Sequence, residues 1–392
     1  MPNRRPLQAA VGLSPERLTD LVDAALDGRG PALLPVASEV PRPHLRVLLE
    51  TMRPASVRTP DGVTPLSDGL AVADDTALVI ATSGSTGRPK GVELGTAALL
   101  AAARASVARI GALPDQPWLC VLPTAHVSGL QVLLRARVLG APVLHRPFDP
   151  AAVMAEAAEH RPHVSLVPTQ LRRLLAAGAD LSLFRTVLLG GAAAGEDLLR
   201  AARQAGARVV TTYGMSETCG GCVYDGLPLD GAAVEVDSEG RIWLSGPMLC
   251  DGYRLRPDLT AHHLVERDGR RWLRTGDLGV LEEGRLRVRG RMDDVINTGG
   301  HKVVAAEVAA LLNRMDAVAE AVVVGRPDPE WGQRVSAVVV PADPAAPPTL
   351  EQVRDWVGAH LPRYAAPREL DLRAELPLLA SGKPDLRRLG QA

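Results

Sequence analysis

The sequence has almost no lysine, few aromatic residues and no long hydrophobic run. Only 3 of its 44 basic residues are lysine, and 45 acidic residues bring the formal net charge to −1. This balance excludes the strongly positive field typical of nucleic-acid-binding proteins. No apolar stretch is as long as the roughly 18 residues of a membrane-spanning helix. The four cysteines are too few for a disulfide framework in 392 residues. We therefore expect a soluble, reduced, cytoplasmic protein.

The three lysines stand out because the other 41 basic residues are arginine. A GC-rich genome explains the arginines by codon composition alone. It does not explain why lysine is kept at Lys90, Lys302 and Lys383, each of which lies in a motif described below. We expect these side chains to have been kept for chemistry that arginine cannot perform equally well.

Short runs rich in valine and leucine alternate with alanine-rich helical segments from about residue 76. The runs are continuously apolar, as in strands that are buried on both faces. We predict strands at 76–82, 118–123, 141–145, 163–169, 185–191 and 208–214. This alternation indicates a mostly parallel sheet covered by helices. The shorter, polar-interrupted runs after residue 230 indicate a small antiparallel subdomain.

The pattern of apolar and polar residues changes again near residue 291. A helical face of valine and leucine is followed by two valine-rich strands, and Thr349 with Gln352 predicts a capping box for a last long helix. We predict an α/β protein with two domains, a large N-terminal domain over residues 1–290 and a small, mobile α+β domain over residues 291–392.

A glycine-rich loop, TSGSTGRPKG, spans residues 82–91 directly after the first predicted strand. Its three glycines free the backbone to wrap around an anion, its hydroxyl side chains supply donors, and Lys90 supplies a cation. This combination suits a polyphosphate. The loop is not a Walker A motif, because Lys90 is followed by glycine and not by serine or threonine. An ordinary Gly/Ser turn is the structural alternative.

This loop resembles the phosphate-binding motif of the adenylate-forming superfamily, which includes acyl-CoA ligases, luciferases and peptide-synthetase adenylation domains. Four further stretches match in the order that the superfamily has: YGMSET (213–218), RTGD (274–277), GRMDDVINTGGHK (290–302) and LASGKPDLRR (379–388). The resemblance covers residues 76–392. It implies an enzyme that activates a carboxylic acid with ATP and Mg²⁺ and then transfers the acyl group to coenzyme A.

The resemblance implies a role for each nucleotide-binding motif. The loop residues that would hold the β- and γ-phosphates are Thr82, Ser83, Gly84, Ser85, Thr86, Gly87 and Lys90. Glu217 would bind Mg²⁺, for which a carboxylate oxygen is a suitable ligand. The adenine would lie between Tyr213 and the segment Gly190, Gly191 and Ala192, next to Gly214, Met215 and Ser216. Asp277 and Arg291 would bind the ribose. A carboxylate at a helix start and a TGD turn are also common without a ligand.

The resemblance also implies how the C-terminal domain takes part. Lys383 would bridge the attacking carboxylate and the α-phosphate, and Asp293 would be the hinge about which the domain rotates between the two half-reactions. Rotation would then present Gly299 and Gly300 to the pantetheine arm of coenzyme A, with Lys302 near one of its phosphates. Read alone, each lysine is an ordinary surface side chain.

Cys219 and Cys222 form a C-x-x-C pair directly after Glu217. Such a pair can be redox-active or half of a zinc site, but no second pair or histidine cluster accompanies it. We interpret it as part of the lining of the nucleotide pocket.

The acyl pocket is predicted between residues 123–140 and 188–222. His126 matches a residue that gates the pocket in the superfamily, and Ser128 follows it. Arg135 interrupts an apolar helical run, so it either lies on the outer helix face or meets a second carboxylate of the substrate. These stretches are similar to the short bacterial o-succinylbenzoate–CoA ligases of menaquinone biosynthesis, whose substrate is an aromatic keto diacid.

Three other functions fit parts of the pattern. A ligase for another aryl or fatty acid is the first; only two phenylalanines and no long apolar tunnel speak against a fatty acid. A stand-alone adenylation domain is the second, although no carrier domain follows in this sequence. A catalytically silent nucleotide-binding homologue is the third, and the intact Lys90, Glu217, Asp277 and Lys383 argue against it.

Overall fold

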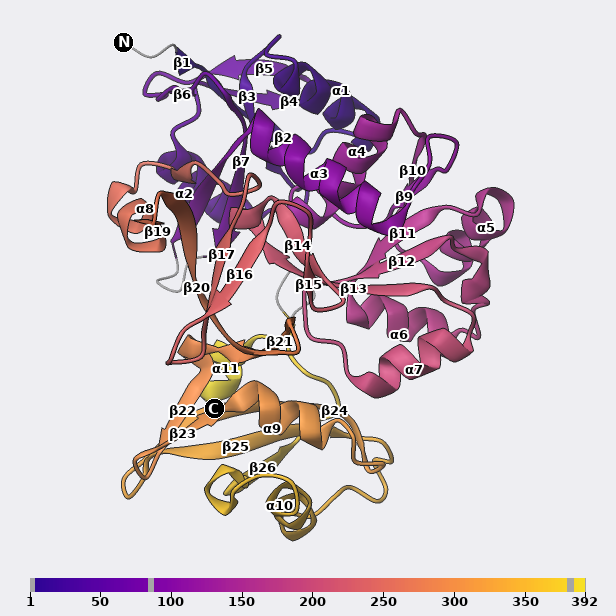
Figure 1. The fold of residues 1–392 in the computed structure, drawn as a ribbon, viewed down its shortest axis with the longest axis vertical. Helices are drawn as coiled ribbons and strands as arrows, with labels where there is room; N and C mark the ends of the chain where they lie inside the picture. The colour runs from indigo at the N-terminus through magenta and orange to yellow at the C-terminus, as the bar shows by residue number, and fades with distance from the viewer. Residues whose placement is uncertain (1–3, 84–87, 379–383, 392) are drawn as a thin grey trace. The chain divides into compact units, whose positions relative to one another are not determined.

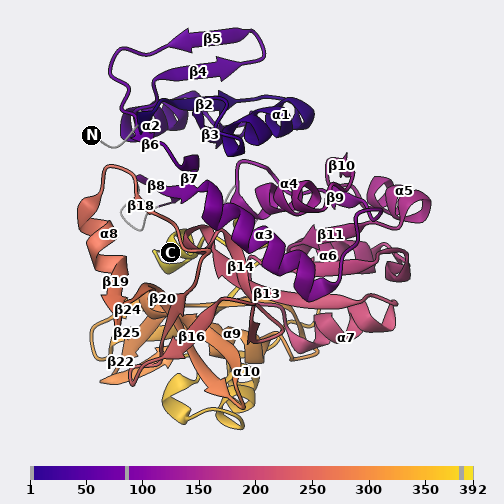
Figure 2. The ribbon, with the colours of Figure 1, turned by 45° about the horizontal axis from the view of Figure 1, so that its top comes forward.

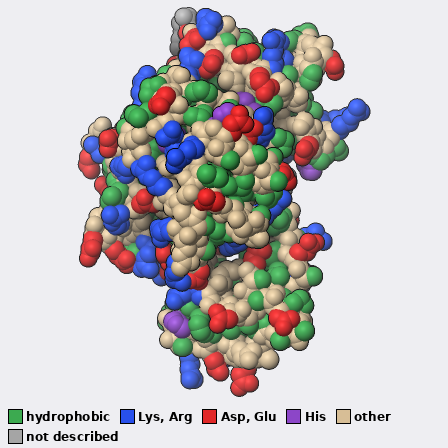
Figure 3. Space-filling view, turned by 90° about the vertical axis from the view of Figure 1, so that its right-hand side faces the viewer, with side chains coloured by type: hydrophobic (Ala, Val, Ile, Leu, Met, Phe, Trp, Pro, Cys, Tyr) green, Lys and Arg blue, Asp and Glu red, His purple; other side chains and the backbone are tan. Residues whose placement is uncertain are grey.

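The computed structural model describes residues 4–83, 88–378 and 384–391. The chain forms two compact units. Unit 1 contains residues 1–194, 200–234 and 244–274, and unit 2 contains residues 195–199, 235–243 and 275–392. Figure 1 shows the elements in chain order, and Figure 3 shows that acidic and basic side chains both occur over one face.

The first sheet of unit 1 has the strand order β18-β8-β7-β3-β2-β4-β5. Its strands are β2 (Leu7–Val11), β3 (Ala32–Val36), β4 (Ser56–Thr59), β5 (Gly62–Pro65), β7 (Thr76–Ser83), β8 (Pro89–Gly95) and β18 (Gly252–Tyr253). β2 and β3 are parallel and almost wholly buried. β7 and β8 form an antiparallel hairpin around the glycine-rich loop. Figure 2 shows the hairpin β4–β5 at the far edge of this sheet.

The helices of this region have clear start signals. α1 (Pro15–Leu26) begins at Ser14, whose side chain accepts a hydrogen bond from the backbone N–H of Arg17, and Pro15 occupies the first helical position. α2 (Arg42–Met52) follows β3. β1 (Arg4–Arg5) and β6 (Val72–Ala73) form a separate two-stranded sheet. This N-terminal β–α–β–α–β region was not predicted, although LQAAV and ALLPV are apolar runs of strand length.

The second sheet of unit 1 has the order β10-β9-β11-β12-β13-β14-β15. Its strands are β9 (Trp118–Cys120), β10 (Val143–His145), β11 (His163–Leu166), β12 (Thr186–Leu189), β13 (Val209–Met215), β14 (Gly220–Tyr224) and β15 (Leu227–Pro228). The first five in this order pair in parallel, whereas β14 and β15 are antiparallel additions. All six predicted strands are confirmed, but β7, the first of them, belongs to the other sheet.

Helices cover this parallel sheet. α3 (Thr96–Ile110) packs on α4 (Val127–Leu139), which lies against β9 and β11, and α6 (Pro168–Ala176) lies on the opposite side in Figure 1. α5 (Pro150–His160) and α7 (Glu196–Gln204) complete the alternation. α3 and α4 both end at a glycine in the left-handed conformation, Gly111 and Gly140. α4 is buried on every side from Gly129 to Ala136, which makes it the central helix of the unit.

The predicted antiparallel segment is also present. It contains β16 (Ala233–Val236), β17 (Arg241–Ser245), α8 (Pro257–His263), β19 (Leu264–Arg267), β20 (Arg270–Glu282) and β21 (Arg285–Arg291). In unit 1, β19 pairs antiparallel with the start of β20. In unit 2, β21 pairs antiparallel with the rest of β20.

The C-terminal part of unit 2 is an α+β fold, as predicted. Its elements are β22 (Val295–Thr298), β23 (His301–Val304), α9 (Ala305–Leu312), β24 (Val318–Asp328), β25 (Gly332–Pro341), α10 (Leu350–Gly358), β26 (Glu369–Leu372) and α11 (Leu386–Gly390). Val308, Leu312, Val353 and Val357 are fully buried in its core. The capping box of α10 is confirmed: Thr349 Oγ1 accepts from Gln352 N at 3.2 Å, and Gln352 Oε1 accepts from Thr349 N at 2.8 Å. The predicted domain boundary near residue 291 stays a prediction.

Candidate active site

A pocket opens where the parallel strands of the second sheet end. Strand carboxyl ends are where α/β sheets bind ligands. The ends of β11, β12 and β13 and the buried face of α4 form its wall, which consists of Leu122, Val127, Ser128, Gln131, Arg135, Ser165, Leu166, Val167, Leu188, Gly190, Gly191, Thr212, Gly214, Gly220 and Gly221. The structure thus brings together five of the predicted residues: Ser128, Arg135, Gly190, Gly191 and Gly214.

Arg135 lies in this pocket wall and not on an outer helix face. Its side chain is 5% exposed. The Nε atom donates to Ser106 Oγ at 2.9 Å, a terminal nitrogen donates to Ser165 Oγ at 3.1 Å, and the guanidinium lies over the Trp118 ring at 5.3 Å. Burial therefore excludes the outer-face interpretation of this arginine.

The surroundings of Arg135 are polar but carry no negative charge. Its two hydrogen-bond acceptors are neutral hydroxyls, and Ser106 Oγ in turn lies 2.6 Å from the hydroxyl of Tyr224. Burial, together with nearby arginines, lowers the pKa of His163 to about 4, so this neighbour is neutral at physiological pH. In the part of the chain that the structure describes, no carboxylate lies within ion-pair distance of Arg135. A buried cation normally has such a partner.

Several residues of this pocket were not predicted from the sequence. Gln131 is 2% exposed and donates from Nε2 to the carbonyl oxygen of Cys219 at 2.5 Å. Its place in the pocket could have been predicted from the sequence, because Gln131 lies one helical turn before Arg135 and therefore on the same face of the helix. Ser165 and Thr212 come from neighbouring strands, and only the paired sheet brings them to the site.

The predicted nucleotide segments lie at the ends of β12 and β13. Gly190 must be glycine, because a Cβ atom there would come within 2.2 Å of Thr212 Oγ1, and a Cβ on Gly214 would come within 2.0 Å of the Gly220 carbonyl oxygen. Ala192 is exposed in the loop after β12. Tyr213, half-buried, pairs with Val223 in the β13–β14 ladder. Met215 ends β13, and Ser216 starts the following 3₁₀ turn.

The phosphate-loop residues are described only in part. Lys90 is the second residue of β8 and pairs with Thr82 of β7, and both side chains are half-buried. The predicted loop residues Gly84, Ser85, Thr86 and Gly87, and the side chain of Ser83, lie outside the described residues, as does Lys383. Roles for these residues stay predictions.

Glu217 sits in the 3₁₀ turn η2 (Ser216–Thr218), which lies against β8. Its Oε1 atom accepts a hydrogen bond of 2.7 Å from the hydroxyl of Tyr253, and its backbone carbonyl accepts from the N–H of Cys250 at 2.8 Å. The predicted phosphate lysine and the predicted magnesium ligand therefore lie on adjacent elements. Tyr253 was missed because it lies 36 residues further along the chain.

The C-x-x-C pair is buried and protonated. Cys219 and Cys222 are 0% and 2% exposed, and burial raises the pKa of Cys222 to about 12 and that of Cys219 well above its usual value. The residues that face the pocket here are Gly220 and Gly221, which lie between the two cysteines. Among the described residues, no group of three or more His, Cys, Asp and Glu side chains is arranged to hold a metal ion.

The predicted ribose residues meet in unit 2. Asp277 and Arg291 are cross-strand partners of β20 and β21, and Arg291 Nε lies 3.9 Å from Asp277 Oδ1. Another Arg291 nitrogen lies 3.9 Å from Asp293 Oδ2, in the 3₁₀ turn that follows β21. The three residues named from two separate motifs therefore form one charged cluster.

Gly299 and Gly300 form the two-residue turn between β22 and β23. Both have positive φ angles, +56° and +80°, which is the conformation that tight hairpins require. A Cβ on Gly299 would also come within 2.5 Å of the Trp331 ring. The turn explains these glycines without a ligand, so their predicted role toward pantetheine stays a prediction. Lys302 is exposed and pairs with Asn297.

His126 is exposed at the start of α4, where it occupies the N-cap position without a side-chain cap.

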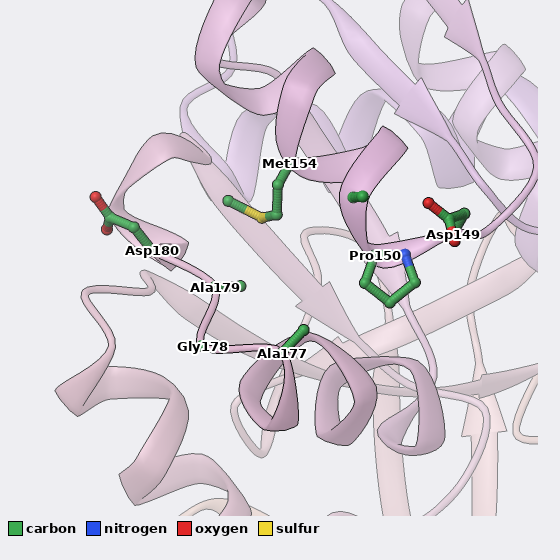
Figure 4. A pocket seen from close by; sticks show the side chains of 8 residues that line it. Asp149, Pro150, Met154, Ala177, Gly178, Ala179 and Asp180 are labelled. Carbon is green, nitrogen blue, oxygen red and sulfur yellow. The ribbon is translucent and has the colours of Figure 1, made fainter.

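A second hollow lies between α5 and the end of α6 and is lined by Asp149, Met154 and Asp180, among others (Figure 4). None of the predicted site residues lines it. Asp149 and Asp180 instead accept backbone hydrogen bonds from Ala152 and Ser182. No helix in the described part of the chain is long and apolar enough to cross a membrane.

Comparison with known proteins agrees with this geometry. Residues 27–254 match the AMP-binding enzyme family, and residues 307–383 match the AMP-binding enzyme C-terminal domain. The chain is 42% identical over 363 residues to a probable 2-succinylbenzoate–CoA ligase of Mycobacterium tuberculosis, covering 88% of this chain and 92% of that protein. It is 33% identical to a 2-succinylbenzoate–CoA ligase of Listeria monocytogenes, covering 78% and 68% of the two chains.

Solved structures show the same fold. The o-succinylbenzoate CoA synthetase of Bacillus subtilis, in complex with its acyl-adenylate intermediate, superposes with a TM-score of 0.85 at 27% identity and covers 99% of this chain and 89% of its own. The amide bond synthetase of Marinactinospora thermotolerans also has a TM-score of 0.85, at 26% identity, and covers 100% and 90% of the two chains. The chain therefore belongs to the AMP-binding family of adenylate-forming enzymes.

Proposed function

We propose that this protein joins o-succinylbenzoate to coenzyme A at the expense of ATP, through an acyl-adenylate, in menaquinone formation. The relatives that carry this name align over most of the chain. The observation that carries the choice of acid is Arg135, a buried guanidinium in the pocket wall with only neutral acceptors. A dicarboxylic acid supplies the missing negative charge while its other carboxylate reacts.

The reaction needs positive charge where two anions approach each other. In the first step a carboxylate oxygen of the acid attacks the α-phosphorus of ATP, and pyrophosphate leaves. We assign to Lys90 and the glycine-rich loop the contact with the β- and γ-phosphates, and to Lys383 the contact with the α-phosphate and the attacking carboxylate. In the second step the thiol of coenzyme A attacks the acyl carbon, and AMP leaves.

The residues around Glu217 fit a nucleotide-bound Mg²⁺. Magnesium at such sites uses one or two carboxylates together with substrate phosphates and water, and supplies charge neutralisation to the leaving pyrophosphate. Glu217 offers one carboxylate on the turn beside the strand of Lys90, and its Oε1 is held by Tyr253. A full protein cage is not needed.

A panel of acids tests the proposal. Purified protein with ATP, Mg²⁺ and coenzyme A should form AMP and the CoA thioester most efficiently with o-succinylbenzoate. The matched control is 4-oxo-4-phenylbutanoate, which lacks only the carboxylate on the ring. Absence of AMP and pyrophosphate with every acid would contradict the enzyme assignment, and equal efficiency with both acids would contradict the substrate.

The role of Lys383 has its own test. Lys383→Ala should lose adenylate formation by several orders of magnitude, while supplied acyl-adenylate is still converted with coenzyme A. Lys383→Arg should fail as well, since a planar guanidinium does not replace a compact ammonium between two oxyanions. An equal loss in both half-reactions would refute the division of roles between them.

A further inference from the structure

Glu217 has a hydrogen-bond partner that lies outside the five motifs described above. The hydroxyl of Tyr253 donates to its Oε1 atom at 2.7 Å. Tyr253 is 7% exposed, and Glu217 is half-buried. This contact is a charge-assisted hydrogen bond in a poorly solvated place, which makes it one of the stronger kinds.

The phenol is itself held in place by its strand. Tyr253 pairs with Val92 of β8, its backbone N–H donates to Thr260 Oγ1 at 2.9 Å, and its ring lies 5.5 Å from that of His263. Val92 is two residues beyond Lys90 on the same strand. The hydroxyl of Tyr253 is therefore anchored to the strand that carries the predicted phosphate lysine.

The direction of the hydrogen bond is fixed. An ionised carboxylate can only accept hydrogen bonds, so the phenol hydroxyl of Tyr253 is the donor. The bond occupies one lone pair of Oε1. It leaves Oε2 and the other lone pair of Oε1 available to a cation.

We propose that Tyr253 is a positioning residue that holds the Glu217 carboxylate in the orientation in which it binds nucleotide-bound magnesium. This inference rests on the metal role given to Glu217 in the proposed function. Without the phenol the carboxylate can rotate, and the metal must fix it at the moment of binding. Partners of this kind, which orient a metal ligand, typically change metal affinity by about 10- to 100-fold when they are removed.

The test measures metal binding directly. Mn²⁺ replaces Mg²⁺ as a paramagnetic probe, and α,β-methylene-ATP replaces ATP because it cannot form an adenylate. The Kd of Mn²⁺ for the complex of protein and analogue is read by electron paramagnetic resonance. Tyr253→Phe should raise this Kd about tenfold, leave the affinity for the metal-free analogue unchanged, and shift the Mg²⁺ concentration for half-maximal adenylation upward with full rate at saturation.

Tyr224→Phe is the matched control. It removes another buried phenol hydroxyl, bonded to Ser106 and not to Glu217, and its Mn²⁺ affinity should equal that of the wild type. Arg5→Met controls for loss of stability, because it removes a buried side chain that binds the carbonyls of Gly30 and Ala25 in unit 1 and leaves Tyr253 and its neighbours unchanged. If Tyr253→Phe lowers the melting temperature, Arg5→Met of equal or lower melting temperature should still bind Mn²⁺ normally.

Each outcome decides one claim. An unchanged Mn²⁺ affinity in Tyr253→Phe overturns the positioning role. A loss that Arg5→Met reproduces also overturns it, since stability would then explain the effect. Glu217→Gln tells the two claims apart: if it too leaves Mn²⁺ affinity unchanged, the metal role in the proposed function fails, whereas a loss in Glu217→Gln alone refutes only the inference about Tyr253.

Discussion

Arg135 in unit 1 and Arg326 in unit 2 are both buried arginines, but they are satisfied in opposite ways. Arg326 is 4% exposed, donates to Glu369 at 2.6 Å and to Asp371 at 2.8 Å, and also binds the carbonyl of Leu389 at the end of α11. Arg135 is as deeply buried and has two hydroxyls and a tryptophan face. The charge of Arg326 is thus neutralised by two carboxylates of the same chain, whereas Arg135 has only neutral hydrogen-bond acceptors.

This difference is the basis for assigning a structural role to Arg326 and for proposing a substrate-binding role for Arg135. A buried ion pair that has its partners fixes the elements that carry them, here β24, β26 and α11. A buried cation without a counter-charge costs free energy that only a ligand can return. A third buried arginine, Arg254, follows the structural pattern, with Glu93 at 3.2 Å and backbone carbonyls around it. A fourth, Arg5, is 6% exposed and is held by the backbone carbonyls of Gly30 and Ala25. Arg135 differs from these three because its side chain lies in the wall of the pocket.

The largest effect on stability should come from Arg326→Met. It leaves Glu369 and Asp371 beside an apolar side chain, so the free energy of unfolding should fall by about 2–4 kcal/mol in a denaturant titration. The preference for the diacid over 4-oxo-4-phenylbutanoate should not change. Arg373→Met is the control, because Arg373 binds the same Asp371 from an exposed position and should cost less than about 1 kcal/mol. Equal losses in both variants would remove the distinction between buried and exposed partners.

A smaller effect is expected for Ser165→Ala. This variant removes one of the two hydroxyls that orient Arg135. It should lower kcat/KM for o-succinylbenzoate by about tenfold or somewhat more, since one hydrogen bond to a charged group contributes at least about 1.5 kcal/mol, and leave the monoacid unaffected. Ser182→Ala, at an exposed hydroxyl bonded to Asp180, is the control. A loss that is the same for both acids would mean that Ser165 shapes the pocket and does not act through Arg135.

The smallest effect concerns acid stability. Hydrogen bonds from Arg334, Ser336 and Arg326 outweigh burial and lower the pKa of Glu369, and a hydrogen bond from Arg373 and one from Arg326 do the same for Asp371. A lowered folded-state pKa gives stability that is present above the unfolded-state pKa of about 4 and is lost as the pH falls through the folded value.

Glu369→Gln should therefore be less stable than the wild type at pH 7, by about 1 kcal/mol, and the gap should close below about pH 4. Urea titrations at pH 7, 5 and 3.5 measure it. A gap that stays constant with pH would show that the carboxylate charge contributes nothing.

Much of this fold could be read from the sequence because its signals are local. Continuous valine and leucine runs marked β9, β11, β12 and β13, and Thr349 with Gln352 marked the start of α10. Length does not explain why β2 and β3 were missed, because each has five residues and β9 has three. Their pairing, between Leu7 and Ala32 for example, is a contact that only the folded sheet makes.

The residues of the candidate site also fall into those with a local sequence signal and those that only the folded structure brings together. Motif residues such as Glu217 and Asp277 are recognisable by their neighbours in sequence, whereas Tyr253 and Ser165 are brought in from distant segments by strand pairing. The orientation of Arg135 could not be decided from periodicity, because α4 is buried on all sides and has no polar face to serve as reference. Only the contacts of the guanidinium settle which way it points.

The central claim is that Arg135 takes its counter-charge from the substrate. A thermodynamic cycle that combines one mutation with one change of substrate tests it. Wild type and Arg135→Met are each assayed with o-succinylbenzoate and with 4-oxo-4-phenylbutanoate. We predict that Arg135→Met lowers kcat/KM for the diacid by about 10²- to 10³-fold, as for a buried charge that loses its partner, and lowers it much less for the monoacid. An equal loss with the two acids would contradict the account.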